Sequence, residues 1–191
     1  MIDIFLMGTI GRSGWREPIK AACAEAGITC FDPAVGEWDE RARRQEVQAL
    51  QEARVIVMAI LPDTASLASL AESGWVALSA MKRKQAFGLY LDLAAEFGDD
   101  ALSNSMEDAS MRARKLVSSH AAALKAQFTR LNVYLAESLQ DLEEWAVARA
   151  KRLKARGGSR PTARKRRNTP TRRRRKAAVA PASKPKSPKL P

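Results

Sequence analysis

Three carboxylates in the first half of the chain are the residues best suited to chemistry: Glu46, Asp63 and Glu72. Asp63 follows a completely apolar run, and Glu72 falls nine residues later, in the early turns of an expected helix. The dipole of a helix lowers the pKa of a carboxyl near its N-terminus, which keeps the group ionised and nucleophilic. Such a carboxylate is suited to attack an anomeric carbon in retaining glycoside chemistry. A solvent-facing helix glutamate is the alternative, and position alone favours it.

Glu46 is a second carboxylate of interest because of its neighbours on the expected helix. It shares one helical stripe with Ala42, Ala49, Leu50 and Ala53. That spacing places its carboxylate towards the sheet and away from water. A boundary residue whose carboxylate reaches solvent is the alternative, which spacing alone favours.

A glycine-rich turn, Gly8 to Gly14, follows the first apolar run. It is neither a Walker loop nor a dinucleotide fingerprint, yet its backbone N–H groups can approach a sugar or phosphate. Neither a metal site nor a cofactor is expected. The residues expected to bind substrate follow the ends of expected strands or lie on the following helices. They are Gly8, Thr9, Ser13, Trp15, Asp32, Pro33, Trp38 and Ser69.

Apolar runs alternate with helical patterns through the first half of the chain. Strands are expected over residues 2–7, 28–31, 55–61 and 86–91, and helices over 15–26, 39–53 and 66–82. This alternation predicts a doubly wound α/β domain over residues 1–97, with a parallel sheet and right-handed crossovers. Ligands of such sheets bind at the carboxyl ends of the strands, near the switch in strand order. The polar residues named above fall at these ends.

Residues 98–156 are expected to form a long α-helical extension. Between Val117 and Ala146, apolar residues recur at alternating steps of three and four, the pattern of an a/d-type stripe. One long helix or a helical hairpin would satisfy it. The stripe either packs on its own domain or forms a dimer, and we expect a homo-oligomer. Ser110, Arg112 and Arg114 are candidate phosphate contacts, and a solvated helix start is the favoured alternative.

The charge of the chain is divided unequally. Residues 1–150 hold 16 Lys/Arg against 21 Asp/Glu, whereas residues 151–191 hold 17 Lys/Arg and no acid. Residues 157–191 are too poor in apolar side chains to offset chain entropy, so a disordered tail is expected. Such a tail binds phosphate backbones with little base selectivity; a solubilising tail without a partner stays open. The cations in its two basic blocks are Arg164, Lys165, Arg166, Arg167, Arg172, Arg173, Arg174, Arg175 and Lys176.

The cysteines and the apolar runs bear on the cellular location of the protein. Cys23 and Cys30 show neither metal spacing nor a disulfide framework, which favours a reducing compartment. The apolar opening, residues 1–7, is too short for a signal peptide, and no apolar run approaches a membrane span. We expect a cytoplasmic protein without a membrane partner, and association with nucleic acid through the tail stays open.

Four blocks resemble one known family. The run Ile4 to Ile10, followed by Ser13-Gly14-Trp15-Arg16, is similar to the opening of nucleoside 2-deoxyribosyltransferase-like domains. The run Phe31 to Val35, with Trp38, resembles the family's aromatic-Asn-Pro-x-Val block and its following Trp, with Asp32 in place of the usual Asn. Glu46 falls where these domains often carry an acid. Ser69-Leu70-Ala71-Glu72 resembles the segment that holds the family's nucleophile.

The resemblance implies a flavodoxin-like sheet and an enzyme of the N-glycosidic bond, either a nucleoside deoxyribosyltransferase-like transferase or an N-glycoside hydrolase. Glu72 would attack C1′ of a nucleoside or nucleotide, and the covalent glycosyl-enzyme would pass to another base or to water. Glu46 or Asp63 would assist the departing base. Gly8, Thr9 and Ser13 would contact the sugar or a 5′-phosphate.

One departure from the family pattern leaves the substrate open. The segment Asp63 to Leu67 lacks a glycine that the family usually carries before its nucleophile block. The balance between transfer and hydrolysis is open for the same reason. Two alternatives stand beside the enzyme: an NAD- or nucleotide-cleaving or sensing relative, and a catalytically silent nucleic-acid-binding protein led by its basic tail.

Overall fold

The computed structural model describes residues 2–34, 36, 39–93, 97, 104–127 and 132–158. Its strands are β1 (Ile4–Gly8), β2 (Cys30–Phe31), β3 (Val55–Ile60), β4 (Ala86–Leu91) and β5 (Val133–Leu135). Its helices are α1 (Arg16–Glu25), α2 (Glu40–Glu52), α3 (Leu67–Arg83), α4 (Asn104–Gln127) and α5 (Leu139–Gly158). The strands form one sheet in the order β2-β1-β3-β4-β5, and every pairing is parallel. This is the flavodoxin-like order, so the predicted fold class is confirmed.

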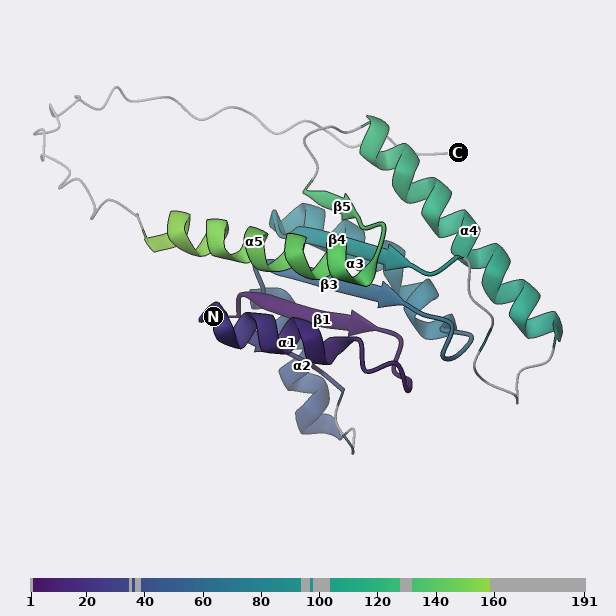
Figure 1. Ribbon diagram of the computed structural model, residues 1–191, viewed down its shortest axis with the longest axis horizontal. Coiled ribbons are helices and arrows are strands. Elements are labelled where there is room, and N and C mark those ends of the chain that lie inside the picture. Colours follow the sequence, from purple (N-terminus) through teal and green to yellow (C-terminus); the bar gives the residue numbers. More distant parts are fainter. Residues whose placement is uncertain are drawn as a thin grey trace, which may run out of the picture. The chain divides into compact units, whose positions relative to one another are not determined.

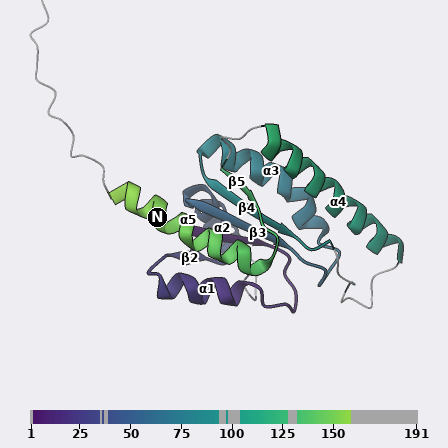
Figure 2. The same cartoon turned by 45° about the horizontal axis from the view of Figure 1, so that its top comes forward.

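Helices cover both faces of the sheet (Figures 1 and 2). Helices α1 and α5 pack on one face, and α2, α3 and α4 pack on the other. Alternate strand residues point to opposite faces, so Leu6 and Val57 join the first core while Phe5 and Met58 join the second. Every residue of β3 is buried, which explains its unbroken apolar sequence.

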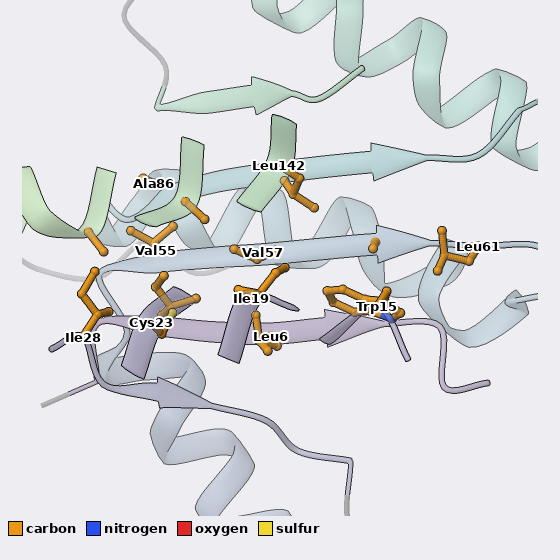
Figure 3. Close-up of a cluster of buried hydrophobic side chains, with 14 residues drawn as sticks. Leu6, Trp15, Ile19, Cys23, Ile28, Val55, Val57, Leu61, Ala86 and Leu142 are labelled. Carbon is orange, nitrogen blue, oxygen red and sulfur yellow. The ribbon is translucent and has the colours of Figure 1, made fainter. Parts of the chain in front are cut away.

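The core between the sheet and α1 places the helix that follows the glycine-rich turn. Ile19 and Cys23 pack from α1 onto Leu6 of β1, and Leu142 packs from α5 onto the same face (Figure 3). Burying one such aliphatic side chain stabilises the fold by about 1.5–3 kcal/mol. Helix α1 therefore has a fixed position, and its first residues are fixed beside the end of β1.

The ends of the first two helices are set by local chemistry. Gly27 adopts a φ of +62° and follows the last turn of α1, as expected for a C′ glycine. Asp39 precedes α2 and accepts a hydrogen bond from the backbone N–H of Ala42 at 2.7 Å. These two signals explain why the sequence pattern places both helices within a residue or two of their observed bounds.

The segment beyond residue 98 differs from the expected long helix or helical hairpin. Its helices α4 and α5 lie on opposite faces of the sheet, and β5 between them pairs with β4. The apolar stripe is divided accordingly, with Val117 against one core and Leu142 and Ala146 in the other. A helix packed on a sheet needs the same three-and-four spacing as a helix packed on a helix. A three-residue strand is too short to interrupt that pattern visibly.

Parts of the sequence interpretation fall beyond the described residues. Trp38 lies outside them, and so do all the cations assigned to the two basic blocks of the tail, Arg164 to Lys176. Among the described helices, none combines the length and the apolar character needed to cross a bilayer. Within the described ranges, no group of three or more His, Cys, Asp or Glu side chains is placed to hold a metal ion.

Candidate active site

A pocket of about 410 Å³ opens at the carboxyl ends of β1 and β3. The chain runs from β1 to β2 on one side and then returns to β3 on the other. Ligands of doubly wound sheets bind at such a switch in strand order. The loops at the arrowheads of β1 and β3 surround this end of the sheet (Figure 1). The pocket is lined by Met7, Gly8, Thr9, Ile10, Arg16, Pro33, Glu46, Thr64, Ser66, Leu67, Ala68, Ser69 and Glu72.

Gly8 begins the pocket wall, and only glycine fits there. Its φ is +123°, and a Cβ on this residue would lie 2.0 Å from the carbonyl oxygen of Ala59. The close approach lets the N–H of Thr9 donate to that same oxygen at 2.9 Å. The turn after β1 is thereby fixed directly against β3.

Thr9 connects the turn after β1 with the loop after β3. Its side chain is 1% exposed, and its Oγ1 accepts from the backbone N–H of Leu61 at 2.8 Å. The Thr9 and Ser66 hydroxyls share a hydrogen bond of 2.7 Å. Ser66 also donates to the carbonyl of Leu61 at 2.9 Å. The Thr9 hydroxyl therefore makes its hydrogen bonds within the protein, and its predicted contact with substrate stays a prediction.

Arg16 is a buried cation in the pocket wall, and it was not among the site residues predicted from the sequence. Its Nη1 donates to the carbonyl of Thr9 at 2.8 Å, and its Nη2 donates to that of Gly8 at 3.2 Å. Its Nε lies 3.2 Å from Oδ1 of Asp32. Burial lowers the pKa of the guanidinium, and the Asp32 carboxylate opposes that shift. The position of Arg16 directly after the glycine-rich turn was the signal that could have identified it.

Asp32 and Trp15 support this arginine from two sides. Asp32 accepts from the backbone N–H of Ala34 at 3.0 Å, and its Oδ2 lies 3.7 Å from Nζ of Lys20. The Trp15 ring lies under the guanidinium of Arg16, with Cζ 4.4 Å from the ring centroid. Trp15 is 4% exposed and belongs to the core shown in Figure 3. Neither residue is part of the pocket lining, whereas Pro33 is.

Ser13 and Asp63 contact each other outside the pocket lining. The backbone N–H of Ser13 donates to Oδ2 of Asp63 at 3.0 Å. A Cβ on Gly11 would lie 2.4 Å from that carboxylate oxygen, so the turn approaches Asp63 closely. Asp63 thus holds the glycine-rich turn, and the structure does not bring it together with the two glutamates.

Glu46 and Glu72 line the pocket together from two different helices. Glu46 lies in the middle of α2 and is half-buried, as a residue at the boundary of the apolar stripe would be. Glu72 is the sixth residue of α3. Ser69, one turn before Glu72, is buried and also faces the pocket. Glu46, Glu72 and Ser69 therefore share one pocket.

The pKa of Glu72 is raised, against the sequence expectation. Glu72 as a whole residue is exposed, yet neighbouring atoms partly shield its carboxyl from water. This desolvation is the main cause of the raised pKa. The negative charge of Glu46 raises the pKa further. The helix dipole does not lower the pKa of Glu72 as expected, because the effect of the dipole falls off within the first turn. Glu72 lies in the second turn of α3, where burial and a like charge dominate.

Arg114 was expected in solvent but is fully buried beside the loop after β3. It donates to the carbonyls of Ile60 at 2.9 Å and Leu61 at 2.7 Å. Its Nη2 also reaches the carbonyl of Thr64 and the hydroxyl of Ser66, each at 3.3 Å. The guanidinium group thus donates its hydrogen bonds to backbone and hydroxyl acceptors within the protein. It positions the loop that lines the pocket and is not itself part of the lining.

Ser110 was also expected in solvent and is likewise fully buried. Its hydroxyl donates to the carbonyl of Ala65 at 2.7 Å and accepts from Nε of Arg114 at 3.2 Å. Ser66 in the same loop has a φ of +52°, which is uncommon for a residue with a side chain. Backbone strain of this kind persists where the surroundings fix it. Helix α4 therefore holds the loop in its unusual conformation.

The family of the N-terminal part follows from a comparison with family models. The model described as "Nucleoside 2-deoxyribosyltransferase like" matches residues 1–90. Residues 1–90 are similar to this family. The match includes β1 to β3, nearly all of β4 and every residue of the pocket lining. The nucleoside 2-deoxyribosyltransferase-like region thus contains the whole candidate site and supports membership of a glycosyl-transfer or hydrolase family.

Two further comparisons add little to this assignment. A comparison with curated proteins gives no match. Among solved structures, the chain is similar to TIR domains in the "Structure of the activated Roq1 resistosome directly recognizing the pathogen effector XopQ". That similarity has 16% identity and a TM-score of 0.37, and it covers 79% of this chain and 84% of the other. A superposition this loose informs neither the fold nor the function.

Proposed function

We propose that this protein breaks the N-glycosidic bond of a nucleoside or nucleotide through a covalent glycosyl-glutamate at Glu72. The observation that supports the proposal most is the meeting of Glu72 and Glu46 in one pocket at the switch in strand order. Pairs of carboxyl groups are the usual means of glycoside cleavage. The family match over residues 1–90 supports the same chemistry.

The proposed first step forms one bond and breaks another. An oxygen of the Glu72 carboxylate attacks C1′ of the sugar, and the bond from C1′ to the base nitrogen breaks with its electron pair on the base. Glu46 assists the departing base by hydrogen bonding or by giving it a proton. In the second step, water or another base attacks C1′ and releases the Glu72 carboxylate. Hydrolysis and transfer differ only in this acceptor.

The other walls of the pocket suit the rest of a nucleoside. Its volume of about 410 Å³ lies in the range of small-molecule sites. Leu67, Ala68 and Ser69, the first residues of α3, form one wall. Backbone N–H groups at a helix N-terminus favour anionic or polar groups, so this wall suits sugar hydroxyls or a 5′-phosphate. Gly8 and Thr9 also line the pocket.

The test is release of free base from a panel of nucleosides, 5′-nucleotides and NAD, followed by chromatography with and without an acceptor base. We expect Glu72→Gln to reduce release at least about 1,000-fold, because the amide cannot act as a nucleophile. Glu25→Gln on exposed α1 surface is the matched control and should release base at the wild-type rate.

A slow substrate with a fluorine at C2′ of the sugar separates the covalent route from direct attack by water. We expect the mass of the peptide that contains Glu72 to increase by that of the fluorinated sugar. Release that survives Glu72→Gln would refute the nucleophile. No release from any substrate by the folded protein would instead favour the catalytically silent alternative. Cleavage restricted to NAD would favour the NAD-cleaving relative.

A further inference from the structure

Helix α5 separates its charges along its length. Its acids, Asp141, Glu143 and Glu144, lie in the first half, and its cations follow from Arg149 onwards. The helix dipole favours cations near a C-terminus, but the effect falls off within the last turn. Arg149 and Arg152 lie nine and six residues before Gly158, the last residue of α5. The dipole therefore does not account for these two arginines.

The two arginines border a surface hollow of about 210 Å³, which we call the α5 hollow. Its lining consists of Asn132, Val133, Trp145, Ala148, Arg149 and Arg152. Arg149 donates from Nη2 to the side-chain oxygen of Asn132, which orients its guanidinium beside the start of β5. Trp145 is held in place by stacking on Tyr134, with ring centroids 5.0 Å apart and planes 5° from parallel. These two contacts hold Arg149 and Trp145 in place at the hollow.

Neither arginine of the hollow is neutralised by a carboxylate of its own helix. The residues three and four positions from them on α5, apart from the arginines themselves, are Trp145, Ala146, Ala148, Leu153, Ala155 and Arg156. Among the described residues, no ion pair involves Arg149 or Arg152. Like charges at such spacing destabilise a helix by a few tenths of a kcal/mol. An anion bound between the two guanidinium groups would remove that repulsion.

The chemistry of the surroundings favours a phosphodiester over a lipid surface. Guanidinium groups offer forked N–H donors that match the oxygens of a phosphate. A helix that binds membranes needs a free apolar face, whereas the apolar face of α5, with Leu142, Ala146 and Ala150, is buried on the sheet. The sequence after α5 adds 13 Lys/Arg and no acid or aromatic residue over 159–191. Such a sequence favours contacts with a regular polyanion.

We propose that the α5 hollow binds the phosphodiester backbone of a nucleic acid through Arg149 and Arg152. The hollow lies beside Asn132, which directly precedes β5, and so at the amino end of the sheet. The pocket with Glu72 lies at the carboxyl end, on the side of the arrowheads (Figure 1). Nucleic acid held at the hollow leaves that pocket open. The proposal does not depend on the proposed glycosidic activity.

The experiment measures binding of the full chain to labelled probes of about 20 nucleotides by fluorescence anisotropy. The salt concentration is varied from about 50 to about 300 mM, because phosphate contacts make the affinity depend on salt. Single-stranded DNA, duplex DNA and duplex RNA distinguish the kinds of nucleic acid. The test variant is Arg149→Ala/Arg152→Ala. The control is Arg112→Ala/Lys115→Ala. These two exposed cations on α4 have the same spacing, and their replacement removes the same charge from the other face of the sheet. Circular dichroism establishes that both variants are folded.

We expect the test variant to bind at least one probe about tenfold more weakly than the control does. The slope of log K against log salt should become shallower by about 1.8 for duplex DNA, as the loss of two phosphate contacts requires. In a footprint with the arginine reagent phenylglyoxal, bound probe should protect Arg149 and Arg152 but not Arg112. Peptide mass spectrometry reads the modification at each residue.

Three results would overturn the proposal. Equal affinities and slopes for the two variants would mean that the hollow does not contact the backbone. The same conclusion follows if Arg149 and Arg152 stay reactive when the probe is bound. Vesicles containing phosphatidylserine are a parallel probe: a test variant that loses vesicle binding but keeps wild-type nucleic-acid binding would assign the hollow to lipid.

Discussion

The turn after β1 and the loop after β3 meet at one pocket, yet they are held in different ways. The turn is held mainly by its own sequence: Gly8 permits the close approach to β3, and Arg16 reaches back to the carbonyls of Gly8 and Thr9. Asp63 adds one contact from the other loop, at the N–H of Ser13. The loop is held from a distance, by Arg114 of α4, about 50 residues further along the chain. A loop held by neighbours in sequence can be recognised from sequence. A loop held by a distant side chain cannot.

The difference also separates two buried arginines. Burial lowers the pKa of both guanidinium groups. Arg16 lines the pocket and has Asp32 as its counter-ion. Arg114 is 0% exposed, lies outside the lining and donates mainly to carbonyl oxygens. One cation therefore faces the place where a ligand would bind, and the other is a structural support behind it.

Gly8→Ala tests how the turn after β1 is held, and we expect it to have the largest effect. A Cβ here would meet the carbonyl of Ala59 at 2.0 Å and require a strained φ, so we expect a loss of about 4 kcal/mol in the free energy of unfolding. Gly27→Ala is the control, because Gly27 also has a positive φ but nothing within 4 Å of the added Cβ. It should lose only about 1–2 kcal/mol. Urea denaturation measures both; equal losses would show that the close approach costs nothing.

Arg114→Met tests the loop that is held from a distance. The change removes the charged donor from the buried carbonyls of Ile60 and Leu61, which keep neutral donors such as the N–H of Asp92 and the hydroxyl of Ser66. We therefore expect a loss of about 3 kcal/mol in unfolding free energy. Arg16→Met should lose less, about 1–2 kcal/mol, because pocket water can hydrate the carbonyls it leaves. Arg112→Met, on the exposed side of α4, should stay within about 0.5 kcal/mol of wild type. A larger loss for Arg16→Met than for Arg114→Met would contradict the division into support and pocket wall.

The hydrogen bond between Thr9 and Ser66 joins the two loops and gives a finer test. Thr9→Val, Ser66→Ala and the double variant form a double-mutant cycle measured by urea denaturation. Because the two hydroxyl oxygens lie 2.7 Å apart in a buried setting, we expect a coupling energy of about 1 kcal/mol. Additive losses would mean that each loop keeps its conformation without the other.

The smallest effect concerns Glu72 and the dependence of stability on pH. Because its pKa is raised in the folded state, the folded protein binds the proton more tightly than the unfolded chain does. Stability from this group is therefore present at low pH and is lost as pH rises from the unfolded pKa through the raised folded pKa. Glu72→Gln should remove that loss and stabilise the protein at pH 7 by under about 0.5 kcal/mol, since the group is exposed. Thermal melts at pH 4 and pH 7 measure the difference; a variant less stable at pH 7 would contradict the sign.

Local patterns predicted most of the sheet and the glycine-rich turn. The unbroken apolar run of β3 required burial on both faces, and Asp39 and Gly27 marked helix ends through their own chemistry. The stripe on α2 placed Glu46 at the edge of the buried face, where it is half-buried and lines the pocket. Each of these inferences depends on residues within one helix or strand of each other.

The features that the sequence did not reveal all depend on contacts between distant segments. Strand β5 is three residues long and exists because β4 has an open side. Arg114 and Ser110 look like solvated residues until α4 lies against the end of β3. The raised pKa of Glu72 depends on a neighbour from another helix, Glu46. The predicted roles of the site residues remain predictions that base release and its variants will test.

The edges of the sheet bear on how copies of this protein can associate. Its two outer strands are the shortest ones, with two residues in β2 and three in β5. An edge this short presents few backbone N–H and C=O groups to another chain, a feature by which natural proteins avoid aggregation through their sheet edges. The predicted homo-oligomer would therefore assemble through helix surfaces, and its interface would consist of side chains with no continuous ladder of backbone hydrogen bonds.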